Sequence, residues 1–281
     1  MKYNKIDYFR FIISISIIIS IIIIIILILK FIYKVNIISN FENNQKIHFI
    51  TYGDDKVNCK NRITSEAKIF GAFDSISTYG PENISKEFYN KHKDILQKNR
   101  GGGYWIWKYD IILQKLNEIN DNDILIYTDC GCTINIDGKN KFYEYINMLN
   151  ESQYGIISLQ MLDNIEREWT TRELFKILDI DLESEIAKSG QYTAAILIMK
   201  KSEHLKKILN KCIEIIDKDN KLITDFYNNN QEPYFKENRH DQSILSLIRK
   251  KYNSIIITEY NDSLTIIDEN KNMPFIASRK K

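Results

Sequence analysis

The chain has few cysteines and lacks a phosphate-loop signature, and these absences exclude several classes of protein. Its four cysteines form no CxxC pair; they are Cys59, Cys130, Cys132 and Cys212. This number and spacing argue against a disulfide framework, and against a structural zinc site or a redox dithiol. The GxxxxGK[ST] pattern of P-loop proteins is absent. No internal repeat is visible either.

An excess of positive charge is also missing from most of the chain. The whole sequence has 39 basic and 37 acidic residues, a formal net charge of +2. Five of the basic residues and one acidic residue lie within residues 1–34, so the remainder carries 34 basic and 36 acidic residues. This balance predicts no nucleic-acid partner.

Charge is absent altogether from Phe11 to Leu29, a run of 19 residues that contains 13 Ile. A helix of this length, at about 1.5 Å per residue, is roughly 28 Å long and matches the hydrocarbon thickness of a bilayer. A cleaved signal peptide has a shorter apolar region followed by small residues, and Lys30 to Lys34 offers no such site. The sequence therefore predicts a short tail (1–10), a transmembrane anchor (11–33) and a stem (34–46).

The charges that flank this anchor predict its orientation. Lys2, Lys5 and Arg10 precede the apolar run, together with the amino terminus, whereas Lys30 and Lys34 follow it. The excess on the amino-terminal side favours a short cytoplasmic tail, with the carboxyl-terminal domain across the membrane.

Residues 47–281 are long enough to form one domain with its own core. Apolar runs predict strands at 47–53, 74–79, 124–127, 154–159, 192–199 and 255–258. Between them, amphipathic stretches predict helices at 61–72, 85–97, 111–119, 142–149, 169–178, 204–216 and 240–250. The alternation predicts an α/β domain with a mainly parallel or mixed central sheet. Residues 217–238, rich in Asn and Asp, are expected to form the longest loop, and such loops are usually functional or disordered.

Asp129 closely follows the apolar run Ile124 to Tyr127 and precedes Gly131. A carboxylate at the carboxyl end of a buried strand lies where open α/β sheets keep their ligand crevices. There it can hold a hydrated divalent cation that bridges a diphosphate. The alternative is that Asp129 only caps the turn that follows.

Three glycines precede an aromatic and basic segment, in the order Gly101, Gly102, Gly103, Tyr104, Trp105, Ile106, Trp107 and Lys108. Glycines before a helix amino terminus suit an anion site, and Lys108 adds a point charge for phosphate. The alternative is that the glycines form a turn and that Trp105 and Trp107 belong to the core.

An imidazole, a carboxylate and an amide stand together at the start of a predicted helix, in His240, Asp241 and Gln242. A carboxylate in the first turn is favoured by the helix dipole, and Asp is a preferred N-cap. The same three groups can serve a reaction, so this motif also has two interpretations.

Four segments occur in order along the chain: GGGYWIWK, DILIYTDCGCTIN, EWT and RHDQSILS. Together they resemble a family of GT-A-type nucleotide-sugar glycosyltransferases, whose members carry GYWxWKP, YxDxGC, WTK-like and HDQ segments in this order. The resemblance covers roughly residues 47–260. It implies a GT-A (Rossmann-like) single domain with a mixed central sheet. It also implies a nucleotide-diphospho-sugar donor and a glycan or other sugar-type acceptor.

The resemblance also implies which residues form the site. Asp129 would be the donor or metal carboxylate, with Mn²⁺ or Mg²⁺ as the divalent cation, and His240 and Asp241 would be catalytic. The substrate pocket would be formed by Gly101, Gly102, Gly103, Tyr104, Trp105, Lys108, Asp129, Gly131, Trp169 and Gln242. Tyr109 replaces the usual Pro and Thr171 the usual Lys, while Gly131 stands where a second acid would complete an Asp-x-Asp pair. This last departure leaves metal dependence open.

The leading hypothesis from the sequence is a membrane-anchored glycosyltransferase. Asp241 would take the proton of the acceptor hydroxyl, and His240 would contact a cation or phosphate. A cation or Lys108 would assist departure of the nucleoside diphosphate. A second hypothesis is a non-catalytic, membrane-anchored surface or binding protein that retains a degraded form of the fold. A third, a redox protein using Cys130 and Cys132, is disfavoured by the missing CxxC.

Overall fold

The structure is a computed structural model, and it describes residues 15, 18–30, 45–53, 59–258, 260 and 263–280. Contacts divide the chain into two units, Met1–Gln45 and Lys46–Lys281. Within the first unit, residues 18–30 are helical. Among the described residues, no helix is both long enough and apolar enough to cross a bilayer. The predicted tail, residues 11–14, 16, 17 and 31–33 of the predicted anchor, and the stem up to residue 44 lie outside the described residues.

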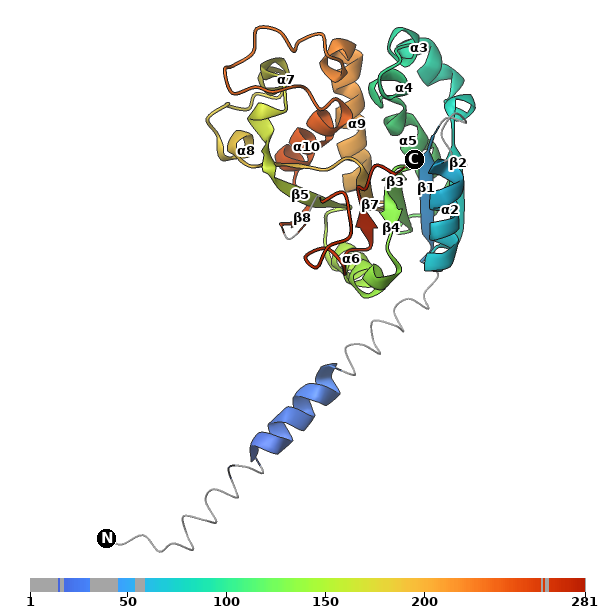
Figure 1. The fold of residues 1–281 in the computed structure, drawn as a ribbon, viewed down its shortest axis with the longest axis vertical. Coiled ribbons are helices and arrows are strands. Elements are labelled where there is room, and N and C mark those ends of the chain that lie inside the picture. The colour runs from blue at the N-terminus through green and yellow to red at the C-terminus, as the bar shows by residue number, and fades with distance from the viewer. Residues whose placement is uncertain are drawn as a thin grey trace, which may run out of the picture. The chain divides into compact units, whose positions relative to one another are not determined.

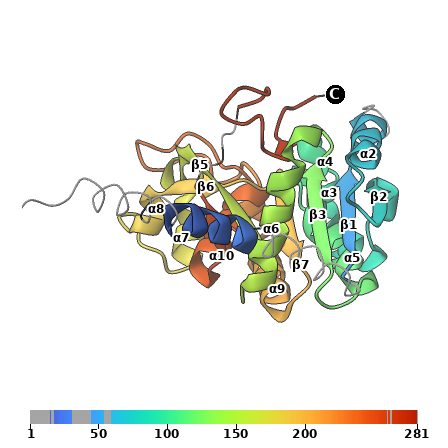
Figure 2. The same ribbon diagram turned by 90° about the horizontal axis from the view of Figure 1, so that it is seen from below.

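A seven-stranded mixed sheet forms the centre of the second unit, with the order β2-β1-β3-β7-β5-β6 and with β8 paired to β5. Its strands are β1 (Ile47–Tyr52), β2 (Ser75–Tyr79), β3 (Ile124–Asp129), β5 (Ile156–Ile165), β6 (Gly190–Tyr192), β7 (Ile196–Lys200) and β8 (Ile255–Ile257). Strands β1, β2 and β3 are parallel, and β7 runs antiparallel to both β3 and β5. Figure 2 shows β2, β1, β3 and β7 from right to left across the view in this order. The predicted α/β class with a mixed sheet is confirmed.

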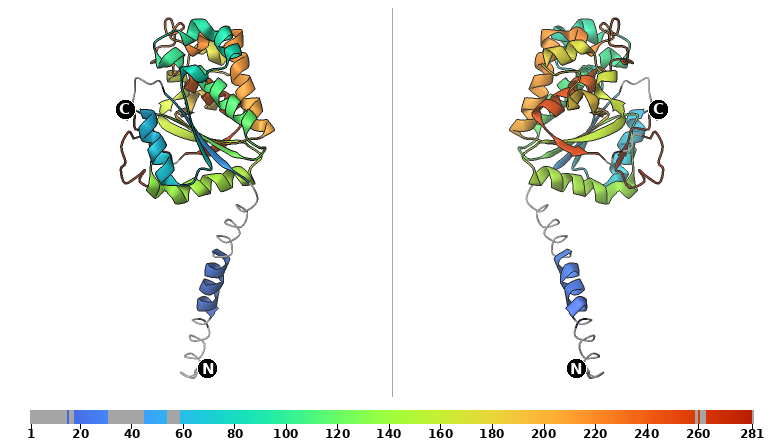
Figure 3. Two further views of the ribbon diagram at one scale, coloured as in Figure 1. Left: turned by 90° about the vertical axis from the view of Figure 1, so that its right-hand side faces the viewer. Right: turned by 90° about the vertical axis from the view of Figure 1, so that its left-hand side faces the viewer.

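Helices lie on both sides of this sheet (Figure 3). They are α2 (Cys59–Phe70), α3 (Lys86–Leu96), α4 (Gly101–Tyr104), α5 (Trp107–Glu118), α6 (Lys139–Glu151), α7 (Arg172–Ile177), α8 (Glu185–Lys188), α9 (Glu203–Lys218) and α10 (Asp241–Tyr252). Leu125 and Tyr127 of β3 belong to the hydrophobic cluster that also contains residues of α5, α9 and α10. Ile126, between them, points to the opposite face of the sheet because side chains alternate along a strand.

Local sequence explains where several helices begin and which face they bury. Ser85 precedes α3 and accepts a hydrogen bond from the Phe88 amide, and Ser202 caps α9 in the same way. Helix α9 buries six residues at helical spacing, namely Leu205, Ile208, Leu209, Cys212, Ile215 and Ile216. This apolar stripe packs against the sheet side that carries α5 and α10.

The strand predicted at 192–199 is in fact two strands, β6 and β7, separated by Thr193 to Ala195. The carbonyls of Tyr192 and Thr193 accept hydrogen bonds from Arg249 Nη2, at 3.0 and 2.9 Å. Arg249 is fully buried in α10. A side chain from a helix distant in sequence therefore holds the bend. The apolar sequence of residues 192–199 does not indicate where the strand is interrupted.

Two further predictions near the carboxyl-terminal half need correction. The helix predicted at 169–178 is limited to α7, because a 3₁₀ turn at Glu166–Glu168 precedes it. The predicted loop at 217–238 contains a 3₁₀ turn at Asn220–Ile223. Its end is fixed by buried Asn238, whose side-chain amide donates to the carbonyls of Leu222 and Thr224, both at 2.9 Å. This loop is thus tied to the domain by hydrogen bonds.

A disulfide joins Cys59, at the start of α2, to Cys130, which follows β3, with 5.3 Å between their Cα atoms. The small number of cysteines did not predict this link. Cys132 is free and buried, and burial raises the pKa of its thiol well above the ordinary value. The redox hypothesis, which paired Cys130 with Cys132, is therefore wrong.

The carboxyl-terminal tail returns to the end of β3. Strand β9 (Phe275–Ile276) pairs antiparallel with β4 (Thr133–Ile134). Beyond it, the Lys280 amide donates to the Gly131 carbonyl at 2.8 Å. Figure 1 shows β9 in red beside β4. The two-residue strands β4 and β9 were not predicted, because such short strands have no periodicity to detect.

Candidate functional site

A cleft of about 710 Å³ opens at the carboxyl ends of β1 and β3. Tyr52 and Asp129, the last residues of these strands, are opposite one another in the sheet register and both line it. The start of α10 and the segment leading into α5 form further walls. Its size falls within the range of small-molecule sites, roughly 300–1,000 Å³. The expectation that Asp129 and the Trp105–Lys108 segment share one cleft is confirmed.

Lys108 links the two carboxylates of this cleft. Its ammonium lies 2.5 Å from Asp241 Oδ2 and 3.3 Å from Asp129 Oδ1, and it also donates to the Ala194 carbonyl at 3.0 Å. The Lys108 side chain is only 1% exposed. One buried cation thus joins the end of β3, the start of α10 and the bend before β7.

Lys108, Asp129 and Asp241 form a triad, in which burial and charged neighbours set the protonation of Lys108 and Asp241. Burial alone lowers the pKa of Lys108, but Asp129 and Asp241 together raise it above the ordinary value, so the amine stays charged. Burial raises the pKa of Asp241 to about 6, although Lys108 opposes this effect. Asp241 is therefore ionised at neutral pH and close enough to its pKa to exchange a proton.

Asp241 is the first residue of α10 and not its cap. The N-cap position belongs to His240, whose side chain makes no capping hydrogen bond. The Asp241 carboxylate instead bonds Lys108. In the structure, Asp241 therefore does not cap α10.

His240 occupies a strained backbone conformation at the wall of the cleft, with φ 59° and ψ −121°. Its Nδ1 lies 3.0 Å from the Ile223 carbonyl, which only accepts, so Nδ1 carries the proton. Burial lowers the pKa of His240 to about 4, so the ring is neutral near pH 7. Nε2 is buried, lies 3.7 Å from Asp225 Oδ1 and makes no hydrogen bond within the described residues.

The three glycines form a turn that positions the aromatic residues. Gly101 to Trp105 all have positive φ, a conformation that glycine adopts without strain. At Gly103, a Cβ atom would come within 2.7 Å of the Leu96 Cα. The Gly101 carbonyl accepts a hydrogen bond from Trp107 Nε1 at 3.0 Å, and the Trp107 ring stacks on Tyr52 at 3.6 Å. These glycines do not line the cleft. Their role is therefore to form a turn, as the second interpretation of this segment expected.

The remaining predicted residues divide between the cleft and its support. Gln242 lines the cleft, accepts a hydrogen bond from the Ala194 amide and donates to Gln191. Tyr104 and Trp169 do not line it. Tyr104 packs its ring on His240, at 5.0 Å between centroids, and Trp169 supports the guanidinium of Arg239 at 4.0 Å.

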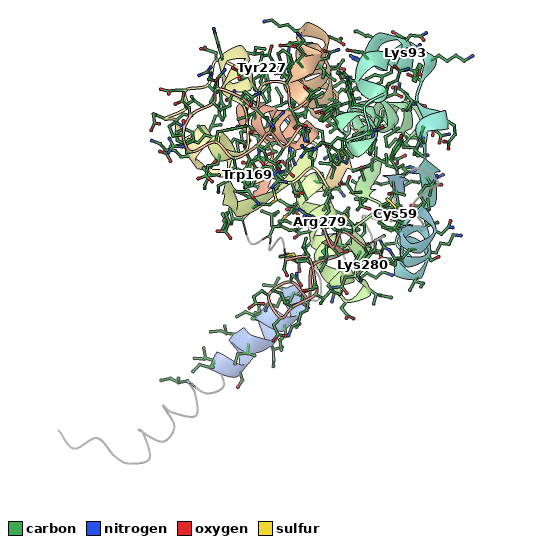
Figure 4. All side chains as sticks on the ribbon, turned by 45° about the horizontal axis from the view of Figure 1, so that its top comes forward. Cys59, Lys93, Trp169, Tyr227, Arg279 and Lys280 are labelled. Atoms are coloured by element: carbon green, nitrogen blue, oxygen red, sulfur yellow. A yellow bond between two sulfur atoms is a disulfide. The ribbon has the colours of Figure 1, made fainter. Side chains whose placement is uncertain are left out.

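Sequence reasoning missed the three arginines of the cleft, Arg100, Arg239 and Arg279. Arg239 stands directly before the His-Asp-Gln triplet, and this position was the available signal. Arg279 lies near the chain's end, where no periodicity or motif pointed to it. Figure 4 labels Arg279 and Lys280 on this tail, near Cys59 of α2.

A divalent cation at Asp129 does not fit the groups around that carboxylate. Asp129 Oδ1 already accepts from the Tyr127 hydroxyl at 2.5 Å and faces the Lys108 ammonium. The second acidic position is Gly131, which has no side chain to offer. Across the described part of the chain, no three His, Cys, Asp or Glu side chains are grouped to hold a metal. One oxygen of each carboxylate is therefore already engaged by the Lys108 ammonium.

Comparison with known proteins gives no family assignment. No protein-family model matches this chain. The proline–tRNA ligase of Wigglesworthia glossinidia brevipalpis is 27% identical over 202 residues, 68% of this chain and 35% of that enzyme. The chain thus spans about a third of the length of this curated relative.

Several solved structures share part of this backbone fold. A glycosyltransferase involved in glycosylation of the major capsid of PBCV-1 is 9% identical, with TM-score 0.47, over 82% of this chain and 93% of that chain. Mouse xyloside xylosyltransferase 1 is 8% identical, with TM-score 0.42, over 78% and 86%. The galactosyltransferase LgtC, in complex with donor and acceptor sugar analogues, is 12% identical, with TM-score 0.39, over 75% and 72%. Scores and identities this low establish neither a family nor an activity.

Proposed function

We propose that this protein is a glycosyltransferase of GT-A type that moves a sugar from a nucleotide-diphospho-sugar donor to a sugar-type acceptor. The observation that carries the proposal is the buried ammonium of Lys108 between Asp129 and Asp241, at the carboxyl end of β3. Ligand crevices of α/β sheets occur at this edge. The segments that resemble the glycosyltransferase motifs contribute all three members of the triad.

Asp241 is the proposed base of the transfer. Its pKa of about 6, raised by burial, keeps it ionised at neutral pH. It would take the proton of the acceptor hydroxyl while the acceptor oxygen bonds the anomeric carbon. The bond from that carbon to the diphosphate oxygen would break, and the nucleoside diphosphate would leave with the electron pair. Lys108 would hold Asp241 in position through their hydrogen bond.

His240 has a different proposed role from the one expected from sequence. A neutral ring with Nδ1 bonded to the Ile223 carbonyl brings no positive charge to a phosphate. Its Nε2 is buried, 3.7 Å from Asp225 Oδ1, and is closed to a substrate. We propose that His240 positions Asp241, the residue that follows it, by packing its ring on Tyr104 and Trp105.

A panel of nucleotide sugars tests the proposed function. The full chain should release nucleoside diphosphate from one or a few of them, faster when mono- and disaccharide acceptors are added. Asp129→Asn should lower this turnover much more than Cys132→Ser, because Cys132 is buried and unreactive. If no donor is turned over while a saccharide still binds, the protein is the non-catalytic binding protein of the second hypothesis.

We also propose that residues 11–33 anchor the enzyme in a membrane, with a short cytoplasmic tail and the domain on the opposite side. The 19-residue uncharged run supports the anchor. The Cys59–Cys130 disulfide supports the orientation, because disulfides persist in oxidising compartments. Carbonate extraction of membranes should leave the full chain in the pellet, and its release into the supernatant would contradict the anchor.

A further inference from the structure

The place of a bridging metal ion between the cleft carboxylates is taken by Lys108. Its ammonium contacts both Asp129 and Asp241 and is excluded from solvent. With two carboxylates and one ammonium, the triad keeps a net negative charge. It cannot therefore neutralise a diphosphate by itself, and positive charge for that ligand must come from elsewhere in the cleft.

The tail fills the space of the missing second acid and brings an arginine there. A Cβ atom on Gly131 would lie 3.3 Å from the Arg279 Cα, tighter than most such contacts. The Gly131 carbonyl also accepts hydrogen bonds from the Lys280 amide and the Ser278 hydroxyl, at 2.8 and 3.1 Å. Where an Asp-x-Asp pair would place its second carboxylate, this chain places a tail whose Arg279 lines the cleft.

The arginines of the cleft differ in how many hydrogen bonds and ion pairs they make with the described residues. Arg100 is held by Asp225, at 3.0 Å to both oxygens, and by Glu237. Arg239 lies on the Trp169 ring and has one ion pair, with Glu237 at 3.3 Å. Arg279 makes no hydrogen bond or ion pair with the described residues. Burial lowers the pKa of Arg239, Glu237 opposes this effect, and repulsion from Arg279 and Arg100 adds to it. All three arginines line the cleft.

We infer that Arg279 and Arg239 bind the donor diphosphate and that the protein needs no divalent cation to do so. The inference rests on the proposed glycosyltransferase function and specifies how that site holds its substrate. Each phosphate of a nucleoside diphosphate carries negative charge, and the planar guanidinium fork pairs with two phosphate oxygens at once. An anion between the two arginines would relieve their mutual repulsion. Lys108 remains with the carboxylates in the free and the bound state.

Binding of nucleoside diphosphates to the full chain tests this inference. Calorimetric titrations with UDP, GDP, ADP and CDP are run once in EDTA and once in Mg²⁺ or Mn²⁺. We expect one of these to bind with the same affinity, within about twofold, in EDTA and in metal. Arg279→Ala and Arg239→Ala should each weaken binding by about tenfold or more, the usual scale for a lost charge-assisted hydrogen bond. Lys280→Ala is the matched control, since it removes the same charge from the same tail outside the cleft.

The outcomes separate this inference from the proposed function. Binding that is lost in EDTA and restored by Mg²⁺ or Mn²⁺ would overturn the inference and leave the glycosyltransferase proposal standing. Binding that is indifferent to both arginine variants would overturn it as well. If none of the four nucleotides binds in any condition, the proposed function itself fails, and the inference fails with it. Thermal unfolding of each variant shows whether a loss of binding comes from a loss of folding.

Discussion

The two halves of the domain position their parts of the cleft by different means. Residues 46–151 place Asp129 with parallel strands and apolar packing, in which Ile124, Leu125 and Ile126 are fully buried. Residues 156–258 place Asp241 with buried polar groups. Helix α10 is held there by hydrogen bonds to the side chain of Glu166 and from the side chain of Arg249. Apolar packing fixes a position through the complementary shapes of side chains. Buried hydrogen bonds fix it through their direction, and removing one partner costs more stability because the other partner is left unsatisfied.

Glu166 is the centre of the polar half. It is completely buried, and it accepts hydrogen bonds from Thr170, Gln191 and Ser246, while Lys250 lies 2.8 Å from Oε2. These partners join the turn after β5, strand β6 and α10. The apolar half has a smaller counterpart in buried Asp123, which accepts hydrogen bonds from the Lys46 and Asn120 amides and contacts His48 Nε2. The comparison predicts that the two halves respond differently to substitution.

Glu166→Gln should have the largest effect, a loss of about 3 kcal/mol in the free energy of unfolding, because it leaves the buried Lys250 ammonium without its counter-charge. Urea denaturation followed by circular dichroism measures this loss. Glu183→Gln is the control, since Glu183 is exposed and pairs at the surface with Arg167 and Lys188. Equal stability of the two variants would break the distinction between the halves.

Asp241→Asn should lower the transfer rate by roughly a hundredfold or more, the usual scale for a lost acid–base group. It should also lower the melting temperature, but by less than Glu166→Gln does, because Asp129 still pairs with the buried Lys108 ammonium. The substitution keeps the shape of the side chain and an amide oxygen that can accept from Lys108. Initial rates at saturating donor and acceptor, measured beside thermal unfolding, separate the two effects. A variant with near-normal turnover would falsify the assignment of Asp241 as the base.

The pH dependence of transfer should show an acidic limb near pH 6. Burial raises the pKa of Asp241 to about 6, so protonation below that pH removes the base, and kcat/KM should be about tenfold lower at pH 5 than on the plateau. His240, with its pKa lowered to about 4 by burial, stays neutral over this range and adds no limb. The residual activity of Asp241→Asn should lack the limb. A flat profile down to pH 5 in the unmodified protein would exclude Asp241 as its source.

Ile126→Val should have the smallest effect, a destabilisation of about 1 kcal/mol, because it removes one methylene from a buried position in the apolar half. Its unfolding midpoint in urea should fall slightly, and its transfer rate should stay unchanged. A loss as large as that of Glu166→Gln would show that β3 is as sensitive as the polar half.

The sequence predicted the apolar half best, for a physical reason. Strands such as 47–52 and 124–129 are local, and their apolar residues are confined between turn residues, so the pattern alone identifies them. The bend at Thr193 to Ala195 depends on Arg249, more than fifty residues away in the sequence, as its hydrogen-bond partner. No local pattern of residues contains that information.

The site was predictable where its residues belong to recognisable segments. Asp129, Lys108 and the triplet from His240 to Gln242 do meet in one cleft. The contact between Lys108 and both carboxylates, and the approach of Arg279, come from chain crossings that only the tertiary structure contains. The sequence leaves two interpretations of the glycines open, because it does not separate a left-handed turn from an anion-binding loop.

The Cys59–Cys130 link closes a loop between residues 71 positions apart. In the chain-entropy account, such a cross-link stabilises the folded state by about 4 kcal/mol, a large part of the 5–15 kcal/mol that holds a typical domain together. Before oxidation, the newly made chain would therefore be a marginal protein that opens easily. In the proposed membrane-anchored orientation, this weakness would ease the passage of the chain through a translocation pore, and oxidation on the far side would then stabilise the fold.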